Sequence, residues 1–323
     1  MSKNVLVTGG LGYIGGRVCQ HISRESSIQL RVGTRDYQQL KPDWLNNGCM
    51  VNFDLIDQNS LDKACDGVHS IVHLAAINEH DCAANPEQAL IINSLGSVKL
   101  LNSAIKAGVQ RFIYVSTAHI YGSPLSGTLT EESLPRPQHP YAITHKTAED
   151  YILAAHDKGQ INAVVLRLSN GFGYPERASV SRWTLLVNDL CKQAMTSKKI
   201  ALHSSGNQVR DFITLADVAR AVEHVLNMTK GETSDGLFNL GGEYSMRIID
   251  MAEIIVERCK KVFGLKLNIE RMNPDANEIS TRLEYSMEKI KSTGFTLRSN
   301  FNEEIDGTLK LCHDSFGLDN IKY

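Results

Sequence analysis

The sequence predicts an α/β protein with a doubly wound parallel sheet and a smaller mixed α/β region toward the C-terminus. Short β-branched runs alternate with helical patterns through the first half of the 323 residues. A glycine-rich turn follows the first of these runs and leads into the first helical pattern. With 42% hydrophobic and 22% charged residues, the composition is typical of a folded protein with a large core.

The predicted elements of the first half follow one another in regular order. Apolar runs predict strands over residues 4–8, 29–34, 50–53, 70–74, 111–116 and 163–168. Apolar residues at helical spacing predict helices over residues 13–23, 61–64, 87–107 and 141–156. The alternation ends after Asn170, and residues 171–182 form a predicted loop containing Gly and Pro.

Charge and cysteine content exclude several classes of function. The 34 Lys and Arg against 36 Asp and Glu give a net charge of −2, which favours neither nucleic acid nor a membrane surface as partner. No apolar stretch is long enough to span a bilayer, and the first residues do not resemble a signal peptide, so we expect a cytoplasmic protein. The seven cysteines are scattered and form no metal-binding pattern, which predicts buried thiols and no metal site.

The turn Thr8-Gly9-Gly10-Leu11-Gly12-Tyr13-Ile14-Gly15 is the first candidate for a binding site. Gly9, Gly12 and Gly15 would let the backbone approach a pyrophosphate at the start of the helix, with Tyr13 and Ile14 beside it. A plain structural turn is the alternative. The position between first strand and first helix favours dinucleotide binding. We therefore expect a dinucleotide-binding domain over residues 1–170 and a mainly substrate-binding domain over residues 171–323, some of whose segments return to the first.

The ends of the next strands suggest which dinucleotide is bound. An acidic residue at the end of the second strand would bind the adenosine ribose of NAD, but Arg35 stands there, suited to the 2′-phosphate of NADP. Asp36 holding a ribose, with Arg35 in solvent, is the alternative. Asp54-Leu55 is expected at the adenine, and the small side chains of Ala75-Ala76 near a cofactor ribose. We predict NAD or NADP, with a preference for NADP.

Several motifs in order make the chain resemble the extended short-chain dehydrogenase/reductases, and within them the nucleotide-sugar epimerase/dehydratase branch. In the first domain these are the glycine turn, Asp54-Leu55, His73-Leu74-Ala75-Ala76, Asn93 with Gly96, Val115-Ser116-Thr117, Tyr121-Gly122 and Tyr141. In the second domain they are residues 167–173, 210–213, 217–219 and 238–242. The resemblance implies a Rossmann domain followed by a substrate domain.

Proton transfer points to Tyr141 as the catalytic acid/base, because moving a hydride at a hydroxyl-bearing carbon requires a group that exchanges the hydroxyl proton. The resemblance implies that Thr117 bonds the same oxygen and that a lysine four residues after the tyrosine activates it. Here that position holds His145, and the lysine is Lys146. Thr144 and Glu149 fit the family's spacing and favour His145 as a true replacement that contacts Tyr141 and the cofactor. A weakened or inactive site is the alternative.

The resemblance also implies the substrate contacts. Asn170 would bind the sugar or its phosphate, and Arg210 would pair with the diphosphate, with Thr117 and His119 beside the sugar. The 4,6-dehydratases carry an Asp and a Glu directly after the threonine, where this chain has Ala118 and His119. Dehydration is therefore not expected. The family's Arg-Gly-Asp pattern near the C-terminus is blurred over residues 273–277.

Three functions remain open at this point. The leading one is an NAD(P)-dependent epimerase of a nucleotide-diphosphate sugar, acting by hydride transfer at C4. A reductase or dehydrogenase of a nucleotide-linked sugar needs the same residues, and a non-catalytic dinucleotide sensor would explain His145. The predicted helices over 87–107 and 141–156 carry apolar residues on more than one face, which together with the family's usual pairing predicts a homodimer: Ile91, Leu95, Ala148, Ile152 and Leu153.

Overall fold

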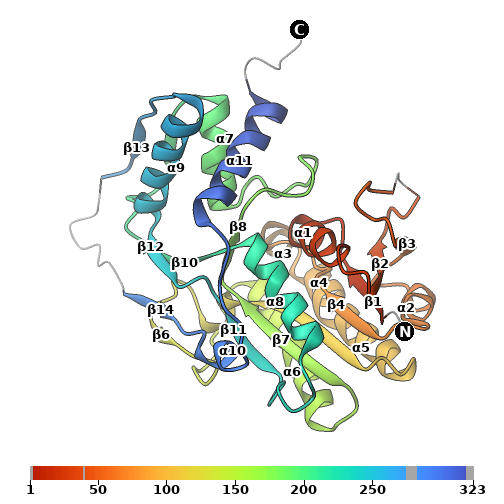
Figure 1. Ribbon diagram of the computed structural model, residues 1–323. Helices are drawn as coiled ribbons and strands as arrows, with labels where there is room; N and C mark the ends of the chain where they lie inside the picture. Colours follow the sequence, from red (N-terminus) through yellow and green to blue (C-terminus); the bar gives the residue numbers. More distant parts are fainter. Residues whose placement is uncertain (1–2, 39–40, 274–281, 318–323) are drawn as a thin grey trace.

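A computed structural model describes residues 3–38, 41–273 and 282–317, and its central feature is a seven-stranded parallel sheet (Figure 1). The strand order is β11-β7-β5-β4-β1-β2-β3. The strands are β1 (Lys3–Thr8), β2 (Ile28–Thr34), β3 (Gly48–Asn52), β4 (Ser70–His73), β5 (Arg111–Thr117), β7 (Asn162–Leu168) and β11 (Leu237–Leu240). The predicted doubly wound parallel sheet is thus confirmed, with β11 as a strand that the sequence did not reveal.

Helices cover both faces of this sheet, because its strands are apolar on both sides. One face is covered by α1 (Tyr13–Ile22), α8 (Leu215–Asn227) and α10 (Glu288–Ser292). The other is covered by α2 (Gln58–Cys65), α5 (Ser97–Lys106) and α6 (Pro140–Asp157). Alternate residues of β5 show the division: Ile113 and Val115 belong to the first core, and Phe112 and Tyr114 to the second.

The sheet changes winding direction between β1 and β4, which lie side by side. The chain runs from β1 outward to β2 and β3, and then returns to the other side of β1 to form β4. In doubly wound folds the crevice beyond the C-terminal ends of two such strands is the usual binding place for a ligand. Thr8 and His73 stand at these two ends and pair in register.

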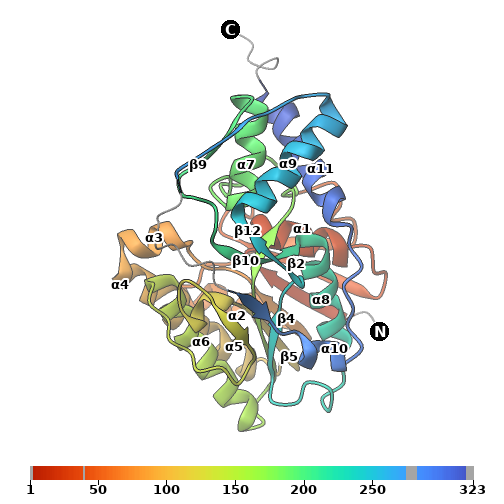
Figure 2. The same cartoon turned by 90° about the vertical axis from the view of Figure 1, so that its left-hand side faces the viewer.

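The C-terminal half forms most of a smaller region, which lies above the large sheet in Figure 2, at the C-terminal ends of its strands. Its core lies among α7 (Leu186–Thr196), α9 (Ile248–Phe263) and α11 (Phe301–Phe316). Three short sheets complete the region: β12 (Tyr244–Arg247), β10 (Val209–Thr214) and β8 (Asn170–Phe172); β13 (Ile269–Arg271) and β9 (Ile200–Leu202); β14 (Leu283–Tyr285) and β6 (Gly127–Leu129). Because α8 and β11 join the large sheet, this half of the chain contributes to both regions.

Some local predictions were wrong. The single helix expected over 87–107 consists of α4 (Pro86–Ala89), the π-helical turn η1 (Leu90–Gly96) and α5, while α3 (Glu79–Ala84) and the 3-10 turn η2 (Ala118–Tyr121) were missed. Strand β8 also takes in the first two residues of the expected loop, Gly171 and Phe172. A π-helical turn widens the helix by one residue per turn, and periodicity alone does not reveal it.

Two further expectations concern exposure. Six of the seven cysteines are buried, but Cys49 on β3 is exposed, because this strand forms the edge of the sheet. Over the residues that are described, no helix combines the length and the apolar character needed to cross a bilayer. Residues 274–277 of the blurred C-terminal pattern lie outside the described residues.

Candidate active site

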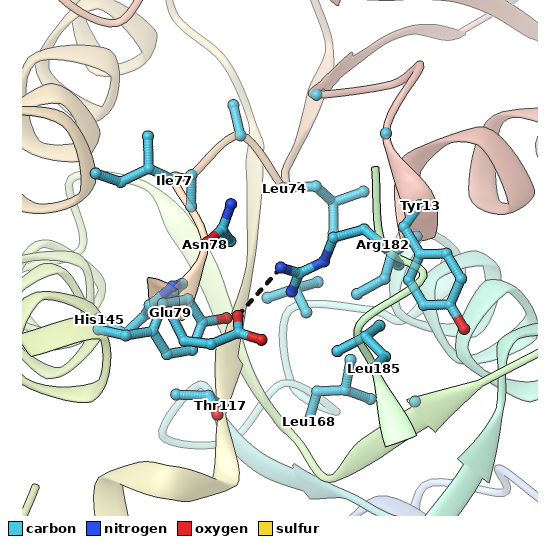
Figure 3. Close-up of a pocket in the computed structure, with 18 of the residues that line it drawn as sticks. Tyr13, Leu74, Ile77, Asn78, Glu79, Thr117, His145, Leu168, Arg182 and Leu185 are labelled. Atoms are coloured by element: carbon cyan, nitrogen blue, oxygen red, sulfur yellow. Dashed lines mark hydrogen bonds and ion pairs between the residues drawn. The ribbon is translucent and has the colours of Figure 1, made fainter. Parts of the chain in front are cut away.

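A cleft of about 960 Å³ lies beyond the C-terminal ends of β1, β4 and β5, between the large sheet and the C-terminal region. This volume is at the upper end of the range usual for small-molecule sites. Residues from both halves of the chain line it, from the glycine loop to Arg210. Figure 3 shows Tyr13 and Leu185 at one side of the cleft and His145, Glu79 and Thr117 at the other.

The glycine loop forms the floor of the cleft at the start of α1. Gly9 has φ +65°, and a Cβ there would lie 3.0 Å from the Ala75 backbone. At Gly15 a Cβ would lie 2.1 Å from the Gly9 carbonyl oxygen, so no side chain fits. Gly12 caps the helix without any side-chain hydrogen bond, which leaves the N–H groups of the first turn to face the cleft.

Tyr13 joins this loop to the C-terminal region. Its hydroxyl lies 2.9 Å from the Gly173 carbonyl oxygen and 3.1 Å from Asn188 Oδ1. Burial raises the pKa of this hydroxyl far above its ordinary value, so it stays protonated as a donor. Ile14 and Gly15 line the same wall of the cleft. The predicted cofactor loop thus also holds the two halves of the site together.

The predicted adenosine-side residues come together at the far end of the cleft. Arg35, Asp54, Leu55, Ala75 and Ala76 all line it. The Arg35 side chain is exposed at the rim, whereas its neighbour Asp36 does not belong to the lining. The Asp54 carboxylate accepts the Ile56 N–H at 3.1 Å, which orients it at the end of β3.

Tyr141 and Thr117 meet in the cleft from two different elements. Tyr141 lies in the first turn of α6, which begins at Pro140 and is capped by the His139 side chain, 3.2 Å from the Tyr141 nitrogen. Thr117 ends β5, is buried, and accepts the His119 N–H at 3.2 Å. Burial raises the pKa of Tyr141 to about 12, Arg182 opposes the rise, and Glu79 adds to it.

His145, and not Lys146, occupies the wall of the cleft beside Tyr141. The two rings of Tyr141 and His145 have centroids 4.4 Å apart, as expected for residues one helical turn apart. Lys146 points elsewhere and pairs with Asp150, and it does not line the cleft. The helix therefore keeps the register that the sequence predicted, with a histidine where the lysine was expected.

His145 is uncharged in this environment. Its side chain is 3% exposed, and burial lowers its pKa to about 4. Nδ1 lies 2.7 Å from the Tyr114 hydroxyl, whereas Nε2 has no hydrogen-bond partner within the described part of the chain. A neutral imidazole replaces a fixed positive charge, so Tyr141 is activated less than a lysine would activate it.

The expected substrate residues line the opposite end of the cleft. Asn170 on β8 donates to the Asp211 carbonyl oxygen at 2.9 Å. Arg210 does not pair with its neighbour Asp211, whose carboxylate accepts the Gly242 N–H at 2.9 Å. Burial lowers the pKa of Arg210. The pKa of His119 is lowered first by burial and then by the positive charge of Arg210. A guanidinium that has lost solvent beside a cleft favours an anionic ligand.

An ion pair that the sequence did not reveal crosses the cleft. Arg182 Nη1 lies 3.1 Å from Glu79 Oε2, and both residues line the cavity (Figure 3). Glu79 begins α3, the helix that was missed, and Arg182 ends the predicted loop over 171–182. The two residues are 103 positions apart, and no sequence motif predicts a contact over that distance. Only the folded structure reveals the pair.

The cleft fits a dinucleotide by its shape and by its unsatisfied groups. Ser116 Oγ and His145 Nε2 are buried in its wall, and neither has a hydrogen-bond partner among the residues described. A buried polar atom without a partner is unfavourable unless a ligand supplies one. Together with the open glycine loop, these atoms fit hydroxyl and phosphate groups. No cluster of metal-ligating side chains occurs in the described residues.

Comparison with known proteins gives a consistent result. The signature of the NAD dependent epimerase/dehydratase family matches residues 5–241. The dTDP-D-glucose 4,6-dehydratase of Mus musculus is 27% identical over 330 residues, covering 98% of this chain and 90% of the mouse protein. The low-salt glycan biosynthesis protein Agl12 of Haloferax volcanii is 25% identical over 314 residues, covering 94% and 96%.

Solved structures share the fold along nearly the whole chain. A UDP-N-acetylglucosamine 4-epimerase from Methanobrevibacter ruminantium has a TM-score of 0.80 at 23% identity, covering 96% of this chain and 98% of that one. A UDP-glucuronic acid 4-epimerase from Bacillus cereus, solved with NAD, has a TM-score of 0.80 at 21% identity, covering 96% of both chains. Fold and glycine loop thus define a dinucleotide-binding protein of the doubly wound class.

The chain belongs to the NAD dependent epimerase/dehydratase family, because the family signature spans most of its length. This confirms the resemblance to the extended short-chain dehydrogenase/reductases and the expectation of an NAD(P)-dependent enzyme. The roles assigned above to single residues stay predictions.

The environment of Tyr141 leads to a prediction about pH. With a pKa of about 12, the hydroxyl loses its proton only at high pH, so the lower limb of the pH–rate profile should lie at alkaline pH. His145→Lys adds a positive charge one turn away. At an effective dielectric of about 20 and a separation of roughly 5 Å, that charge contributes roughly 3 kcal/mol, or about two pKa units.

The limb should therefore move to lower pH in the His145→Lys variant, and the pH dependence of kcat measures this. Lys146→Met removes the neighbouring amine that pairs with Asp150 and serves as the matched control. A limb that moves in the Lys146→Met variant and stays in place in the His145→Lys variant would contradict the assignment of His145.

Proposed function

We propose that the protein is an NAD(P)-dependent epimerase of a nucleotide-diphosphate sugar that inverts C4. The observation that carries this proposal is the meeting of Tyr141 and Thr117 in one cleft, with the glycine loop at one end and Arg210 at the other. A bound dinucleotide would take a hydride from C4 and return it to the opposite face of the sugar. Tyr141 removes the hydroxyl proton and gives it back.

Thr117 and Tyr141 have different roles at the sugar hydroxyl. The Tyr141 hydroxyl exchanges the proton, because it is the titratable group of the pair that points into the cleft. Thr117 is held by the His119 N–H and orients the same oxygen. Arg210 binds the diphosphate, which keeps the nucleotide in place while the sugar turns over. Asn170 and His119 line the space between these two sites.

The carboxylates of the cleft argue against elimination of water, although several relatives are named as 4,6-dehydratases. Elimination requires a protonated acid beside the leaving hydroxyl. Among the described lining residues the carboxylates are Asp54, Glu79 and Asp81. Asp54 belongs to the adenosine end, and Asp81 accepts from Asn78 at 2.7 Å. Glu79 is ion-paired with Arg182, and its pKa is lowered despite burial.

The test of this function is the conversion of nucleotide-linked hexoses without added nicotinamide, because an epimerase recycles its bound cofactor. We expect the C4 epimer as product, measured by NMR of UDP- and dTDP-hexoses after incubation with the enzyme. Tyr141→Phe should reduce turnover by at least a factor of about 10², since a positioned proton-transfer group contributes roughly 10²- to 10⁴-fold. Tyr37→Phe, at an exposed tyrosine that does not line the cleft, is the control.

Other outcomes point to other functions. Stoichiometric consumption or formation of reduced nicotinamide would identify a reductase or dehydrogenase. Dinucleotide binding without turnover of any sugar would leave a sensor, and a 4-keto-6-deoxy product would identify a dehydratase. A Tyr141→Phe variant that keeps more than about a tenth of the activity would exclude Tyr141 as the acid/base.

We further propose that the cofactor is NADP, on the basis of Arg35. Its guanidinium stands at the rim of the adenosine end, where the planar fork suits a 2′-phosphate. NAD is the dinucleotide in the family's name and in the solved B. cereus neighbour. The proposed binding of the 2′-phosphate therefore rests on Arg35 of this chain.

Arg35→Ala should weaken NADP binding by about 1.5 to 3 kcal/mol, as expected for the loss of a charge-assisted hydrogen bond, and leave NAD binding unchanged. Calorimetric titration of the wild type and the variant with each dinucleotide measures the difference. Arg24→Ala, at an exposed arginine outside the cleft, controls for the general loss of positive charge. Equal losses for NAD and NADP would show that Arg35 does not distinguish them.

We also propose a homodimer, through an exposed apolar face on η1 and α6. Of the residues expected to form it, Ile91 and Leu95 are exposed at 44% and 49%, whereas Ala148 and Ile152 are buried in the core under α6. Other exposed apolar residues on these two helices extend the face: Leu90, Ile143 and Tyr151. Since η1 packs against α6, these side chains belong to one surface, and a second copy would bury it.

Light scattering should give twice the chain mass of 35.8 kDa for the wild type at micromolar concentration. Leu95→Asp should shift the mass toward the monomer, because it places a charge in the proposed interface. Leu134→Asp is the control, since Leu134 is 85% exposed and lies outside this face. A monomeric wild type, or equal effects of the two substitutions, would contradict the interface.

A further inference from the structure

Glu79 and Arg182 extend into the cleft from opposite sides, and the backbone of each is anchored. Glu79 is the first residue of α3, where the Asn78 side chain caps the helix by accepting the N–H groups of residues 80 and 81. Arg182 precedes α7, and its backbone carbonyl oxygen accepts from Asn188 Nδ2 at 3.2 Å. Figure 3 shows the two side chains pointing toward each other, with Thr117 and His145 on the Glu79 side.

The pair lies beside the space assigned above to the sugar, which Tyr141 and His119 flank. After burial, Arg182 and Glu79 are the charged groups that shift the pKa of Tyr141 most. Glu79 also partly offsets the lowering of the pKa of His119, which burial and Arg210 cause. Such electrostatic effects fall off with distance. The Glu79 carboxylate is therefore close both to the proposed acid/base and to the residue beside the proposed diphosphate contact.

Arg182 is the arginine of the cleft that has no other assignment. The described lining residues include three arginines and no lysine. Arg35 stands at the adenosine end and Arg210 at the diphosphate end, which leaves Arg182 for the sugar. Its positive charge is balanced, however, because Nη1 lies 3.1 Å from Glu79 Oε2. The two side chains are 24% and 34% exposed, so a ligand meets a neutral pair with accessible polar atoms.

The pair keeps hydrogen-bonding capacity on both partners. A guanidinium has several N–H groups, and the bond to Glu79 uses one; no other acceptor in the described part of the chain binds this side chain. A carboxylate accepts on both oxygens, and Arg182 engages one of them. A sugar hydroxyl both donates and accepts, so it can bind the carboxylate and the guanidinium together. A sugar carboxylate only accepts, so Glu79 offers it no hydrogen bond.

A sugar that carries a carboxylate could pair with Arg182 only by displacing Glu79. Burial opposes the charge of Glu79, and the pairing with Arg182 is the main effect that keeps the pKa of Glu79 low. A displaced Glu79 would be a partly buried charge without a partner. Two carboxylates would also face each other in the cleft, which is unfavourable. An uncharged sugar requires neither change.

We propose that the pair of Glu79 and Arg182 determines the charge of the sugar that the cleft accepts: it binds an uncharged sugar through hydroxyl groups and disfavours a sugar that carries a carboxylate. Glu79 makes the selection, because it neutralises a guanidinium that would otherwise bind a carboxylate. The inference rests on the proposed function, which makes the ligand a nucleotide-linked sugar. It concerns binding alone and gives neither residue a part in proton transfer.

Two nucleotide sugars that differ only at C6 test this selection. UDP-glucose carries a hydroxymethyl group there, and UDP-glucuronate carries a carboxylate. Calorimetric titration of the protein saturated with NADH or NADPH measures binding without turnover, because a reduced dinucleotide accepts no hydride. We expect the wild type to bind UDP-glucose at least about tenfold more tightly. Equal affinities, or tighter binding of UDP-glucuronate, would overturn the proposal without recourse to any variant.

Glu79→Gln should change the selection, because it keeps the size of the side chain and releases the charge of Arg182. UDP-glucuronate should bind at least about tenfold more tightly than to the wild type, and UDP-glucose should lose no more than about tenfold. Asp81→Asn is the matched control: Asp81 also lines the cleft from α3, but it is exposed and accepts from Asn78 at 2.7 Å. There the ratio of the two affinities should stay within about twofold of the wild-type ratio, because solvent screens an exposed charge.

Adding Arg182→Gln to Glu79→Gln shows whether the gain comes from the guanidinium. The gain for UDP-glucuronate should then disappear. A gain that persists would overturn the role of the pair, because it would come from the loss of the Glu79 charge alone.

Binding and turnover are separate measurements, so the two proposals can fail separately. A protein that binds UDP-glucose more tightly but epimerises no nucleotide sugar would refute the proposed function and leave the selection by the pair intact. A protein that epimerises UDP-glucose but binds both ligands equally would refute only the selection. Binding of neither nucleotide sugar would refute both.

Discussion

The buried ion pair between Arg167 and Glu149 fixes the position of the helix on which the site depends. Glu149 lies on α6 eight residues after Tyr141, and Arg167 lies on β7; their side chains are 0% and 3% exposed. The carboxylate accepts from Nη2 at 2.9 Å and from Nε at 3.2 Å. Removing one partner of such a pair leaves a buried charge and costs about 3–5 kcal/mol. The pair therefore sets where α6 meets the sheet.

The same arginine reaches the loop that follows Thr117. Its Nη1 donates to the Tyr121 hydroxyl at 2.8 Å, and Tyr121 donates to Asn239 on β11 at 2.7 Å. Arg167 thus contacts both the helix that carries Tyr141 and the turn that follows Thr117. A second buried pair, between Arg17 on α1 and Glu304 on α11, joins the cofactor helix to the C-terminal region at 2.5 Å. Together these anchors make the cleft largely preformed.

The parts of the site that the sequence predicts are those that local chemistry determines. A glycine is required at position 15, because a side chain there would meet the backbone of the same loop. The place of His145 beside Tyr141 follows from the register of one helix. The ion pair of Arg182 with Glu79 and the contact of His145 with Tyr114 depend on elements that meet only in the folded chain. Tyr114 lies within the strand predicted over 111–116, but the sequence did not indicate that it contacts His145.

The dimer face shows that periodicity can predict a second buried surface on a helix without showing which residues form it. Apolar residues on several sides of α6 indicate that two surfaces are buried, but the pattern does not say which surface belongs to the core. Ala148 and Ile152 pack beneath the helix, and Ile143 and Tyr151 remain outside. The π-helical turn η1 causes a similar problem, because it rotates Ile91 and Leu95 relative to an α-helical count.

His145 holds the position one turn from Tyr141, and the charged side chains that shift the pKa of Tyr141 most are Arg182 and Glu79, which form an ion pair. Arg182 lowers the pKa of Tyr141 and Glu79 raises it, so the two effects oppose each other while the pair is closed. Burial then dominates and keeps the hydroxyl protonated at neutral pH. A neutral histidine suits this arrangement, because it places no ammonium group at a buried position, where the charge would need compensation.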